Sequence, residues 1–475
     1  MGRPFYISLV FSVPLCLCGS SSAAEIEKPN VVLILCDNLG YGDVGCFGST
    51  VHRTPHIDRM AAEGRKFTHF YSASGVCSPS RAALMTGCYP LRIGLHTSSQ
   101  AGAVLRPMDQ LGISADEFTL GEMFKSQGYA TMAIGKWHLG DQLVFLPTRH
   151  GFDDYFGIPY SEDMTADKVP GWPELPLLRG ERVIEAPPDR DQLTERYTEA
   201  AVEFISANRE RPFFLYFPEA TPGSEKTSFA SADFRDKSKN GRYGDAVEEL
   251  DWSAGRILET LTKLGLDQRT LVIWTSDNGA VRRDPPQGSN LPLGGYGYST
   301  NEGGQRMPCL MRWPGRIKPG TECAELATMM DLLPTLAKLV GGELPSDRKI
   351  DGRDINGLIF DEADGRSPHE AFYFYQRDQL QAVRSGRWKL HLPLAKPLRL
   401  GKAGQNRPAA LYDVVADPAE TKDLIAEHAD IVARLTALAE QARADIGDQD
   451  RKGQNVREPG RVENPTPRVL ETTSR

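Results

Sequence analysis

The sequence predicts an α/β fold with a large, mostly parallel β-sheet sandwiched by helices and a smaller C-terminal α+β subdomain. Two observations carry this prediction. Short, nearly continuous apolar segments such as 31–36 and 271–275 are typical of strands that are buried on both faces of a parallel sheet. They alternate with longer segments of helical periodicity such as 246–264. That alternation favours a sheet whose two faces are both covered by helices.

The length and the charge of the chain limit what it can be. A chain of 475 residues is long enough for one large domain and a smaller one. We expect the main domain at 25–344, the subdomain at 345–450, and a disordered tail at 451–475, which is polar and rich in Arg and Pro. The net charge of −8 leaves no basic surplus to neutralise phosphates, so the composition argues against a nucleic-acid partner.

Residues 1–24 have the pattern of a secretory signal peptide. Arg3 supplies a positive start, residues 5–17 are mostly apolar, and small residues at 22–24 suit a cleavage site. The apolar run is too short to span a bilayer, and no later segment is a candidate span. A lipoprotein anchor at Cys18 is a minor alternative. The sequence therefore predicts a secreted or periplasmic protein, with six cysteines left after cleavage whose pairing is open.

Taken in order, apolar runs predict strands and amphipathic periodicity predicts helices. We expect strands at 31–36, 67–72, 129–134, 212–217 and 271–275, and helices at 57–64, 120–127, 194–208 and 246–264. A further helix is expected at 324–340, kinked near its middle by Pro334. Short strand-like pieces then follow at 371–375, 381–385 and 387–392, before a helix at 429–446. This change of texture predicts the α+β subdomain.

Residues 77–87 (CSPSRAALMTG) predict a short helix around which the site is organised. Pro79 suits the first helical turn, where a missing N–H costs nothing, and Gly87 is a natural stop. Cys77 then lies at the helix N-terminus, where free N–H groups and the helix dipole favour an anion. A cysteine taken alone is most often a buried structural thiol.

Polar side chains follow three of the predicted strands. These are Asp37 with Asn38, Lys136 with His138, and Asp277 with Asn278. Because open α/β sheets place their sites at the carboxyl ends of the strands, we expect these groups to gather at one edge. The oxygen ligands in two of the pairs suit Ca²⁺ or Mg²⁺ rather than zinc. Each pair taken alone also fits a solvated turn.

Together these segments resemble the type I, formylglycine-dependent sulfatases of the alkaline phosphatase superfamily, in particular arylsulfatase A-like members. The order Cys-x-Pro-x-Arg at 77–81 resembles the first signature of the family, and residues 128–140 (GYATMAIGKWHLG) resemble the second almost letter for letter. Residues 275–279 resemble the second metal loop, and 302–308 the turn beyond it. The resemblance runs from about Pro29 to Ile446.

The resemblance implies an exported sulfuric-ester hydrolase that acts on a sulfated small molecule or glycan. A formylglycine-generating or equivalent maturation enzyme would oxidise Cys77 to formylglycine, whose hydrate is the nucleophile. One Ca²⁺ would be held by Asp37, Asn38, Asp277, Asn278 and residue 77. Arg81 would position the hydrate, Lys136 would contact sulfate, and His138 would assist the hydroxyl that collapses. Ser161 resembles a further substrate-binding residue.

Three positions depart from the family pattern. Asn38 stands where most members carry a second Asp, although an amide oxygen is still a hard ligand. Gly223 stands where a His protonates the leaving oxygen, and Gly297 where a Lys faces sulfate. Lys226 or a residue from elsewhere could compensate. These two gaps leave two alternatives open, a non-catalytic binder of sulfated glycans and a phosphate or phosphonate ester hydrolase on the same fold.

Overall fold

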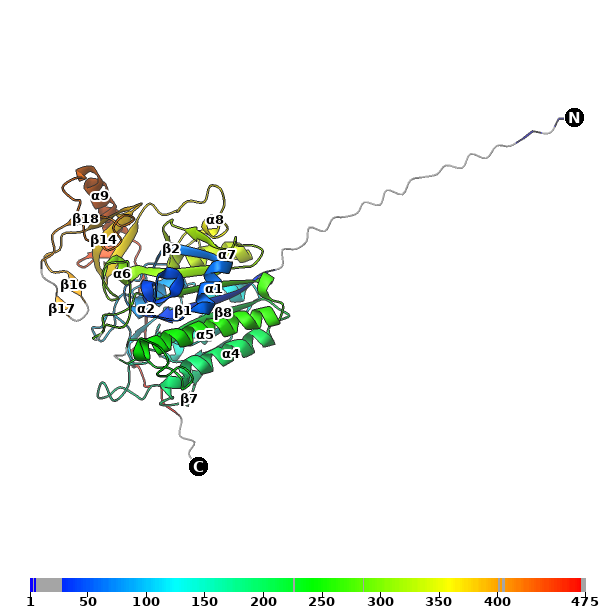
Figure 1. Cartoon of the computed structure of the whole chain (residues 1–475), viewed down its shortest axis with the longest axis horizontal. Helices are drawn as coiled ribbons and strands as arrows, with labels where there is room; N and C mark the ends of the chain where they lie inside the picture. The colour runs from blue at the N-terminus through cyan, green and yellow to red at the C-terminus, as the bar shows by residue number, and fades with distance from the viewer. Residues whose placement is uncertain are drawn as a thin grey trace, which may run out of the picture.

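The structure is a computed structural model that describes residues 1–2, 4–5, 28–224, 227–284, 286–399, 402–403 and 406–470 (Figure 1). The predicted signal peptide lies almost wholly outside the described residues, and Lys226 lies outside them too. The predicted fold class is confirmed: a large mixed sheet with a parallel centre is covered by helices, and an antiparallel subdomain follows. Among the residues described, no helix is long and apolar enough to cross a membrane.

The main domain is built on an eleven-stranded sheet. Its strand order is β11-β2-β10-β9-β1-β8-β4-β5-β6-β7, with β12 beside β2. The central strands β9, β1, β8, β4 and β5 all run parallel, and β10 pairs antiparallel with β9 and β2. The strands are β1 Asn30–Asp37, β2 Arg65–Tyr71, β4 Ala130–Ile134, β5 Asp154–Gly157, β6 Leu177–Arg179, β7 Arg182–Glu185, β8 Phe213–Pro222, β9 Thr270–Ser276, β10 Arg306–Arg312, β11 Thr321–Cys323 and β12 Ala327–Thr328.

The central strands are apolar throughout because both faces of the sheet are buried. In β1, Val31, Leu33 and Leu35 pack into one hydrophobic core, while the alternate residues of the strand pack into the other. The first core is covered by α2 (Cys77–Thr86), α3 (Leu120–Ser126) and α7 (Leu332–Val340). The second is covered by α1 (Pro55–Glu63), α4 (Leu193–Ala207) and α5 (Gly241–Lys263), of which α4 and α5 lie side by side (Figure 1).

The C-terminal subdomain is a four-stranded antiparallel sheet covered by one helix. Its order is β13-β14-β15-β18. Its elements are β13 Phe372–Gln376, β14 Gln379–Ser385, β15 Trp388–His391, β18 Ala410–Asp413 and α9 Ala429–Asp445. Two short helices elsewhere in the chain are α6 Glu302–Gln305 and α8 Asn356–Ile359. Three two-stranded pairs complete the described structure: β16 Leu398–Arg399 with β17 Lys402–Ala403, β19 Gly447–Asp448 with β20 Arg451–Lys452, and β3 Leu111–Gly112 with β21 Gly460–Arg461.

A buried ion-pair network fastens the subdomain to the loop before β10. Lys389 Nζ lies 3.0 Å from a carboxylate oxygen of Glu302 and 3.0 Å from one of Glu420. Glu420 also accepts a hydrogen bond from the backbone N–H of Glu302 at 2.8 Å. Because each of these charges is buried and paired, the network holds the turn at Glu302 in one place. The subdomain therefore supports a loop that, as described below, borders the site.

Two sequence predictions are wrong at the level of secondary structure. Residues 451–470 are not the disordered tail that their composition predicts, since β21 pairs with β3 and Arg457 forms an ion pair with Glu117 at 2.6 Å. The α-helix predicted at 324–340 begins only at Leu332, because residues 327–328 form β12 beside β2 and Met329–Asp331 form a 3-10 helix. Pro334 is therefore the third residue of α7, where it removes no helical hydrogen bond and causes no central kink.

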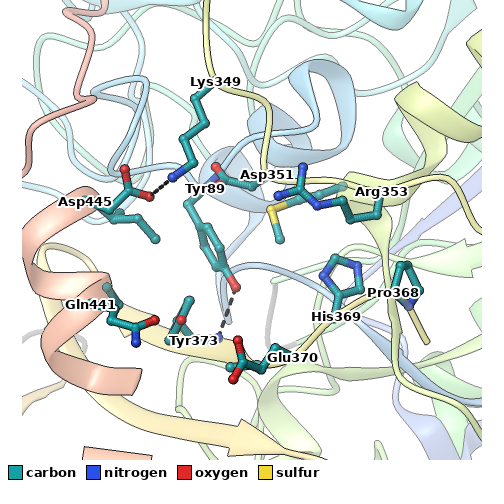
Figure 2. Close-up of a pocket in the computed structure, with 14 residues that line it drawn as sticks. Tyr89, Lys349, Asp351, Arg353, Pro368, His369, Glu370, Tyr373, Gln441 and Asp445 are labelled. Carbon is teal, nitrogen blue, oxygen red and sulfur yellow. Dashed lines mark hydrogen bonds and ion pairs between the residues drawn. The ribbon is translucent and has the colours of Figure 1, made fainter. Parts of the chain in front are cut away.

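A cavity of about 310 Å³ lies between the main domain and the subdomain, away from the predicted site residues. Tyr89 lines it from the main domain, and Tyr373 and Asp445 line it from the subdomain (Figure 2). Several polar groups of the cavity wall bond to one another: Lys349 Nζ contacts Asp445, and the Tyr373 N–H donates to the Tyr89 hydroxyl at 3.0 Å. The cavity contains no side chain that the sequence predicts to be catalytic.

Candidate active site

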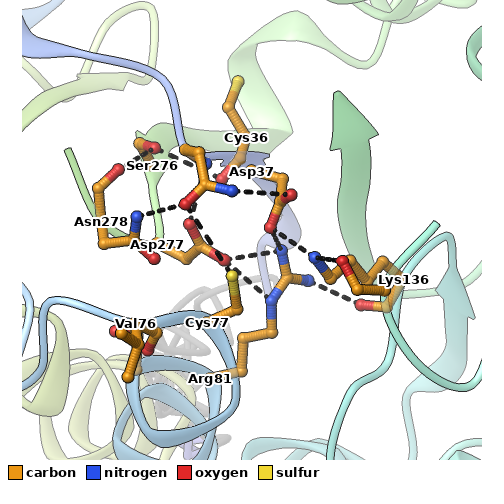
Figure 3. A network of polar contacts seen from close by, with 12 residues as sticks. Cys36, Asp37, Val76, Cys77, Arg81, Lys136, Ser276, Asp277 and Asn278 are labelled. Atoms are coloured by element: carbon orange, nitrogen blue, oxygen red, sulfur yellow. Dashed lines mark hydrogen bonds and ion pairs between the residues drawn. The ribbon is translucent and has the colours of Figure 1, made fainter. Parts of the chain in front are cut away.

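The predicted site residues gather at the carboxyl edge of the parallel strands. Asp37 ends β1, Asp277 follows β9, and Lys136 follows β4. They surround the N-terminus of α2, so that Cys77 lies beside them (Figure 3). The arrangement agrees with the rule that open α/β sheets place their sites at this edge.

Cys77 is the first residue of α2 and is nearly closed off from solvent. Val76 before it is extended, and Gly87 ends the helix at φ +67°. The thiol is 3% exposed, and its Sγ lies 3.9 Å from Asn38 Oδ1. Burial, reinforced by the Asp37 carboxylate, raises the pKa of the Cys77 thiol well above its ordinary value. The unmodified side chain is therefore a neutral thiol, which is a poor nucleophile.

Arg81, one turn further along α2, connects the two carboxylates. Its Nε donates to Asp277 Oδ2 at 3.0 Å, and its Nη2 donates to Asp37 Oδ1 at 2.9 Å. A third hydrogen bond, 2.6 Å long, runs from Nη1 to the Lys136 carbonyl oxygen. All these side chains are fully buried. Since a buried charge is costly unless it is paired, Arg81 and the two carboxylates hold one another in place at the ends of β1 and β9.

Lys136 reaches the same carboxylate from the other side. Its Nζ lies 2.8 Å from Asp37 Oδ1 and 2.9 Å from Ser161 Oγ. The Glu162 carboxylate lies 3.6 Å from the same ammonium group. Burial by itself lowers the pKa of Lys136, but Asp37 outweighs it and holds the pKa above the ordinary value. Lys136 is therefore a permanent cation that touches the predicted pocket residue Ser161.

The oxygen-bearing side chains fit a hard cation. Asp37, Asn38, Asp277 and Asn278 are all fully buried. The ligand atoms of Asp37, Cys77 and Asp277 lie within 4.8 Å of one another. Among the hydrogen bonds of the described chain, Asn278 Oδ1 has no partner although it is buried. Carboxylate and amide oxygens are hard ligands of the kind that Ca²⁺ prefers, so the residue types present fit this ion.

The formal charge of the site also favours a cation. Arg81 and Lys136 supply two positive charges, whereas Asp37, Asp277 and Glu162 supply three negative ones. The five groups together carry a formal charge of −1, which would repel an anionic ester. A bound divalent ion would reverse that sign, so an anionic substrate and a metal fit this site together.

His138 lies behind Lys136 with its backbone at φ +60°. Its Nε2 bonds the carbonyl oxygen of Leu105 at 2.9 Å, and its Nδ1 is buried without a hydrogen-bond partner among the described residues. Burial first, and then the nearby Lys136 and Arg81 charges, lower the pKa of His138 well below its ordinary value. The ring is therefore neutral, with its proton on Nε2 and a free lone pair on Nδ1.

Sequence reasoning missed three side chains that border the site. Glu162 directly follows Ser161, Ser224 follows Gly223, and Tyr298 follows Gly297. Ser224 Oγ accepts a hydrogen bond from Asn38 Nδ2 at 3.0 Å and lies 3.1 Å from the Tyr298 hydroxyl. The only signal in the sequence is adjacency, because each of the three residues directly follows a residue that the family resemblance identifies as part of the site.

Comparison with known proteins decides the family. The profile of the sulfatase family matches residues 29–342, and that of the C-terminal region of aryl-sulfatase matches 367–460. The chain belongs to the sulfatase family. This sulfatase is 40% identical to N-acetylgalactosamine-6-sulfatase of Mus musculus, over 79% of this chain and 74% of that protein. It is 37% identical to human arylsulfatase A over 86% of each chain.

A solved structure supports the same assignment. A sulfatase from work on glycosaminoglycan metabolism by Bacteroides thetaiotaomicron superposes with a TM-score of 0.75 and 29% identity, over 88% of this chain and 99% of that one. This sulfatase is therefore an arylsulfatase-like sulfuric-ester hydrolase, as the sequence predicts.

Proposed function

We propose that this sulfatase is an exported enzyme that hydrolyses the sulfate esters of a sulfated small molecule or glycan, using formylglycine made from Cys77 and one Ca²⁺. The single observation that carries the proposal is the position of Cys77. It lies at the N-terminus of α2 beside two buried carboxylates, and Arg81 connects those carboxylates (Figure 3). A buried neutral thiol has no catalytic use there, whereas an oxygen nucleophile at the same position would face the cation site.

Each neighbouring side chain has a role in this proposal. Formylglycine would supply a hydroxyl that attacks sulfur and a second hydroxyl whose loss of a proton restores the aldehyde. Ca²⁺, held by Asp37, Asn38, Asp277 and Asn278, would offset negative charge on the sulfate oxygens. Lys136 binds and orients sulfate, with Ser161 beside its ammonium group. His138 accepts the proton of the collapsing hydroxyl at its free Nδ1.

The substrate class and the cellular location follow from different observations. Two relatives act on sulfated carbohydrates by their names, an N-acetylgalactosamine-6-sulfatase and a sulfatase from a glycosaminoglycan pathway. A sulfated glycan is thus the substrate class that we favour. Export rests on the signal-peptide pattern at 1–24. The conversion of Cys77 requires that a formylglycine-generating or equivalent enzyme act on the chain before it folds, because Cys77 is buried in the folded protein.

The test combines a modification and an activity. The protein is co-expressed with a formylglycine-generating enzyme, and the peptide that contains residue 77 is analysed by mass spectrometry. We expect an aldehyde at residue 77 and turnover of 4-nitrophenyl sulfate well above that of 4-nitrophenyl phosphate. The control variant Cys77→Ala should be inactive toward both. Turnover by a sample whose Cys77 is unmodified would contradict the formylglycine mechanism, and a preference for the phosphate ester would favour the phosphohydrolase alternative.

A further inference from the structure

The backbone and the surroundings of Gly223 both disfavour a side chain at this position. Its backbone has φ +77°, and a Cβ built on it would lie 2.3 Å from Glu162 Oε1. Glu162 is itself fixed, because Oε1 accepts from the Ser224 N–H at 2.8 Å and Oε2 accepts from Ser161 Oγ at 2.9 Å. A side chain at 223 would therefore displace a buried carboxylate that also faces Lys136. A proton donor at 223 would therefore require Glu162 to leave these partners.

Gly297 is closed to a side chain by a backbone atom. A Cβ built there would lie 2.3 Å from the carbonyl oxygen of Gly279, directly after the cation-binding pair at the end of β9. The residue that follows, Tyr298, has φ +69°. A bulky aromatic residue in the left-handed region is an outlier that persists only where its surroundings impose it. A hydrogen bond of 2.8 Å from the Tyr298 N–H to the carbonyl oxygen of Gly75 ties it to the loop before Cys77.

The strained backbone delivers the Tyr298 hydroxyl to the site. Its oxygen lies 3.1 Å from Ser224 Oγ, which lies 3.0 Å from Asn38 Nδ2. The Oδ1 atom of the same Asn38 side chain lies 3.9 Å from Cys77 Sγ. Because Ser224 Oγ accepts from Asn38, its own hydrogen can be donated to Tyr298 Oη. That pattern leaves the phenolic O–H free to donate to a substrate.

We propose that Tyr298, oriented by Ser224, is the proton donor to the leaving oxygen in this sulfatase. This inference rests on the proposed function, because it assigns a further residue of the same reaction. In the proposed reaction, a hydroxyl oxygen of the formylglycine hydrate at residue 77 bonds to the sulfur of the ester. The ester sulfur–oxygen bond then breaks, and its electron pair moves to the leaving oxygen. The Tyr298 proton passes to that oxygen and gives the free alcohol. Solvent water takes the proton of the attacking hydroxyl and returns one to the tyrosinate.

The chemistry of a phenol suits this step. A phenol has an ordinary pKa of about 10, so Tyr298 is protonated at neutral pH. Burial raises its pKa further, which makes it a weaker acid that suits only a strongly basic leaving oxygen. An alkoxide leaving group is far more basic than a phenolate and takes the proton readily. Glu162 is not an equivalent donor, because both of its oxygens accept hydrogen bonds and it faces the Lys136 ammonium group. Lys136 is held by Asp37 and Ser161.

The test uses the formylglycine-bearing full-length enzyme and a series of leaving groups. Wild type and Tyr298→Phe are compared on 4-nitrophenyl sulfate, phenyl sulfate and a sugar 6-sulfate. A general acid contributes about 10²- to 10⁴-fold to rate. We therefore expect kcat to fall by about 10²-fold or more on the sugar sulfate, in an intermediate degree on phenyl sulfate, and by less than about tenfold on 4-nitrophenyl sulfate. Tyr296→Phe, two residues earlier on the same loop and 40% exposed, is the matched control and should behave as wild type.

The outcomes separate this inference from the proposed function. Retained 4-nitrophenyl sulfate activity shows that Tyr298→Phe is folded and modified, so a selective loss on poor leaving groups supports the proton-donor role. An equal loss on all three esters, or no loss on any, would overturn it. The proposed function fails separately, when wild type turns over no sulfate ester although residue 77 is the aldehyde.

Discussion

A buried carboxyl group on β8, Glu219, offers a sharp test of how burial shapes this protein. Ser253 Oγ donates to its Oε1 at 2.9 Å, and Oε2 has no partner among the described residues. The side chain is 1% exposed. Burial, which outweighs the Ser253 hydrogen bond, raises the pKa of Glu219 from 4.5 to about 8. The folded protein thus holds Glu219 protonated at pH 7, whereas the unfolded chain ionises it.

The sign of the effect follows from proton linkage. Between the two pKa values the folded state binds more protons at Glu219 than the unfolded state, so the free energy of unfolding falls as pH rises from about 4.5 to about 8. Each pH unit in this range lowers the free energy of unfolding by about 1.4 kcal/mol at most. Relaxation and water penetration reduce the net cost in real proteins. We expect the cost of Glu219 to be on the order of 1–3 kcal/mol at pH 7 to 8.

The variant Glu219→Gln copies the shape of the protonated side chain and cannot ionise. Its free energy of unfolding should match that of wild type at pH 5 and exceed it by about 1–3 kcal/mol at pH 8. Urea unfolding of both proteins between pH 5 and 8 measures this difference. Glu259→Gln, on the exposed side of α5, is the matched control and should show no such trend. A difference between Glu219→Gln and wild type that is the same at pH 5 and pH 8 would refute the reasoning.

Three further predictions follow from other parts of the structure. Added Ca²⁺ should raise the melting temperature of wild type, measured against EDTA by scanning calorimetry, and Asp277→Ala should abolish that rise because it removes a proposed ligand and an Arg81 partner. His69, whose pKa burial lowers to about 2, stays neutral when folded, so stability should fall below pH 6.5 and His69→Phe should lessen that fall in urea titrations. Gly223→Ala should lower both melting temperature and activity on all sulfate esters, since its Cβ meets Glu162; an unchanged melting temperature would contradict the close contact.

Much of the fold could be predicted because its signals are local. Buried parallel strands are apolar on both faces, so residues 31–36 can be predicted as such a strand without knowledge of the strands beside them. The strand ends then carry polar residues, and the rule for open α/β sheets brings Asp37, Lys136 and Asp277 together at one edge, where the structure places them. Local patterns combined with a topological rule were sufficient for this part.

The errors arise where a distant partner decides local structure. The polar segment beyond 450 has the composition of a disordered tail, but Arg457 finds Glu117, and the Thr466 N–H donates to Gln142 at 2.9 Å. Those partners lie more than 300 residues away in sequence. The helix predicted from 324 is shortened because residues 327–328 add to β2. No periodicity within either segment carries this information.

The glycines at 223 and 297 show why absence is hard to interpret from sequence. The sequence predicts a gap at each position, that is, a site which lacks one functional side chain and is otherwise unchanged. In the structure each lies against another group. A Cβ at Gly297 would meet the Gly279 carbonyl, and a Cβ at Gly223 would displace the Glu162 carboxylate. The hydroxyls of Ser224 and Tyr298, one residue further along in both cases, meet instead. The two glycines are therefore linked in space: the segment after β8 and the loop before α6 meet at the contact between Ser224 and Tyr298, which is where the proton donor should be sought.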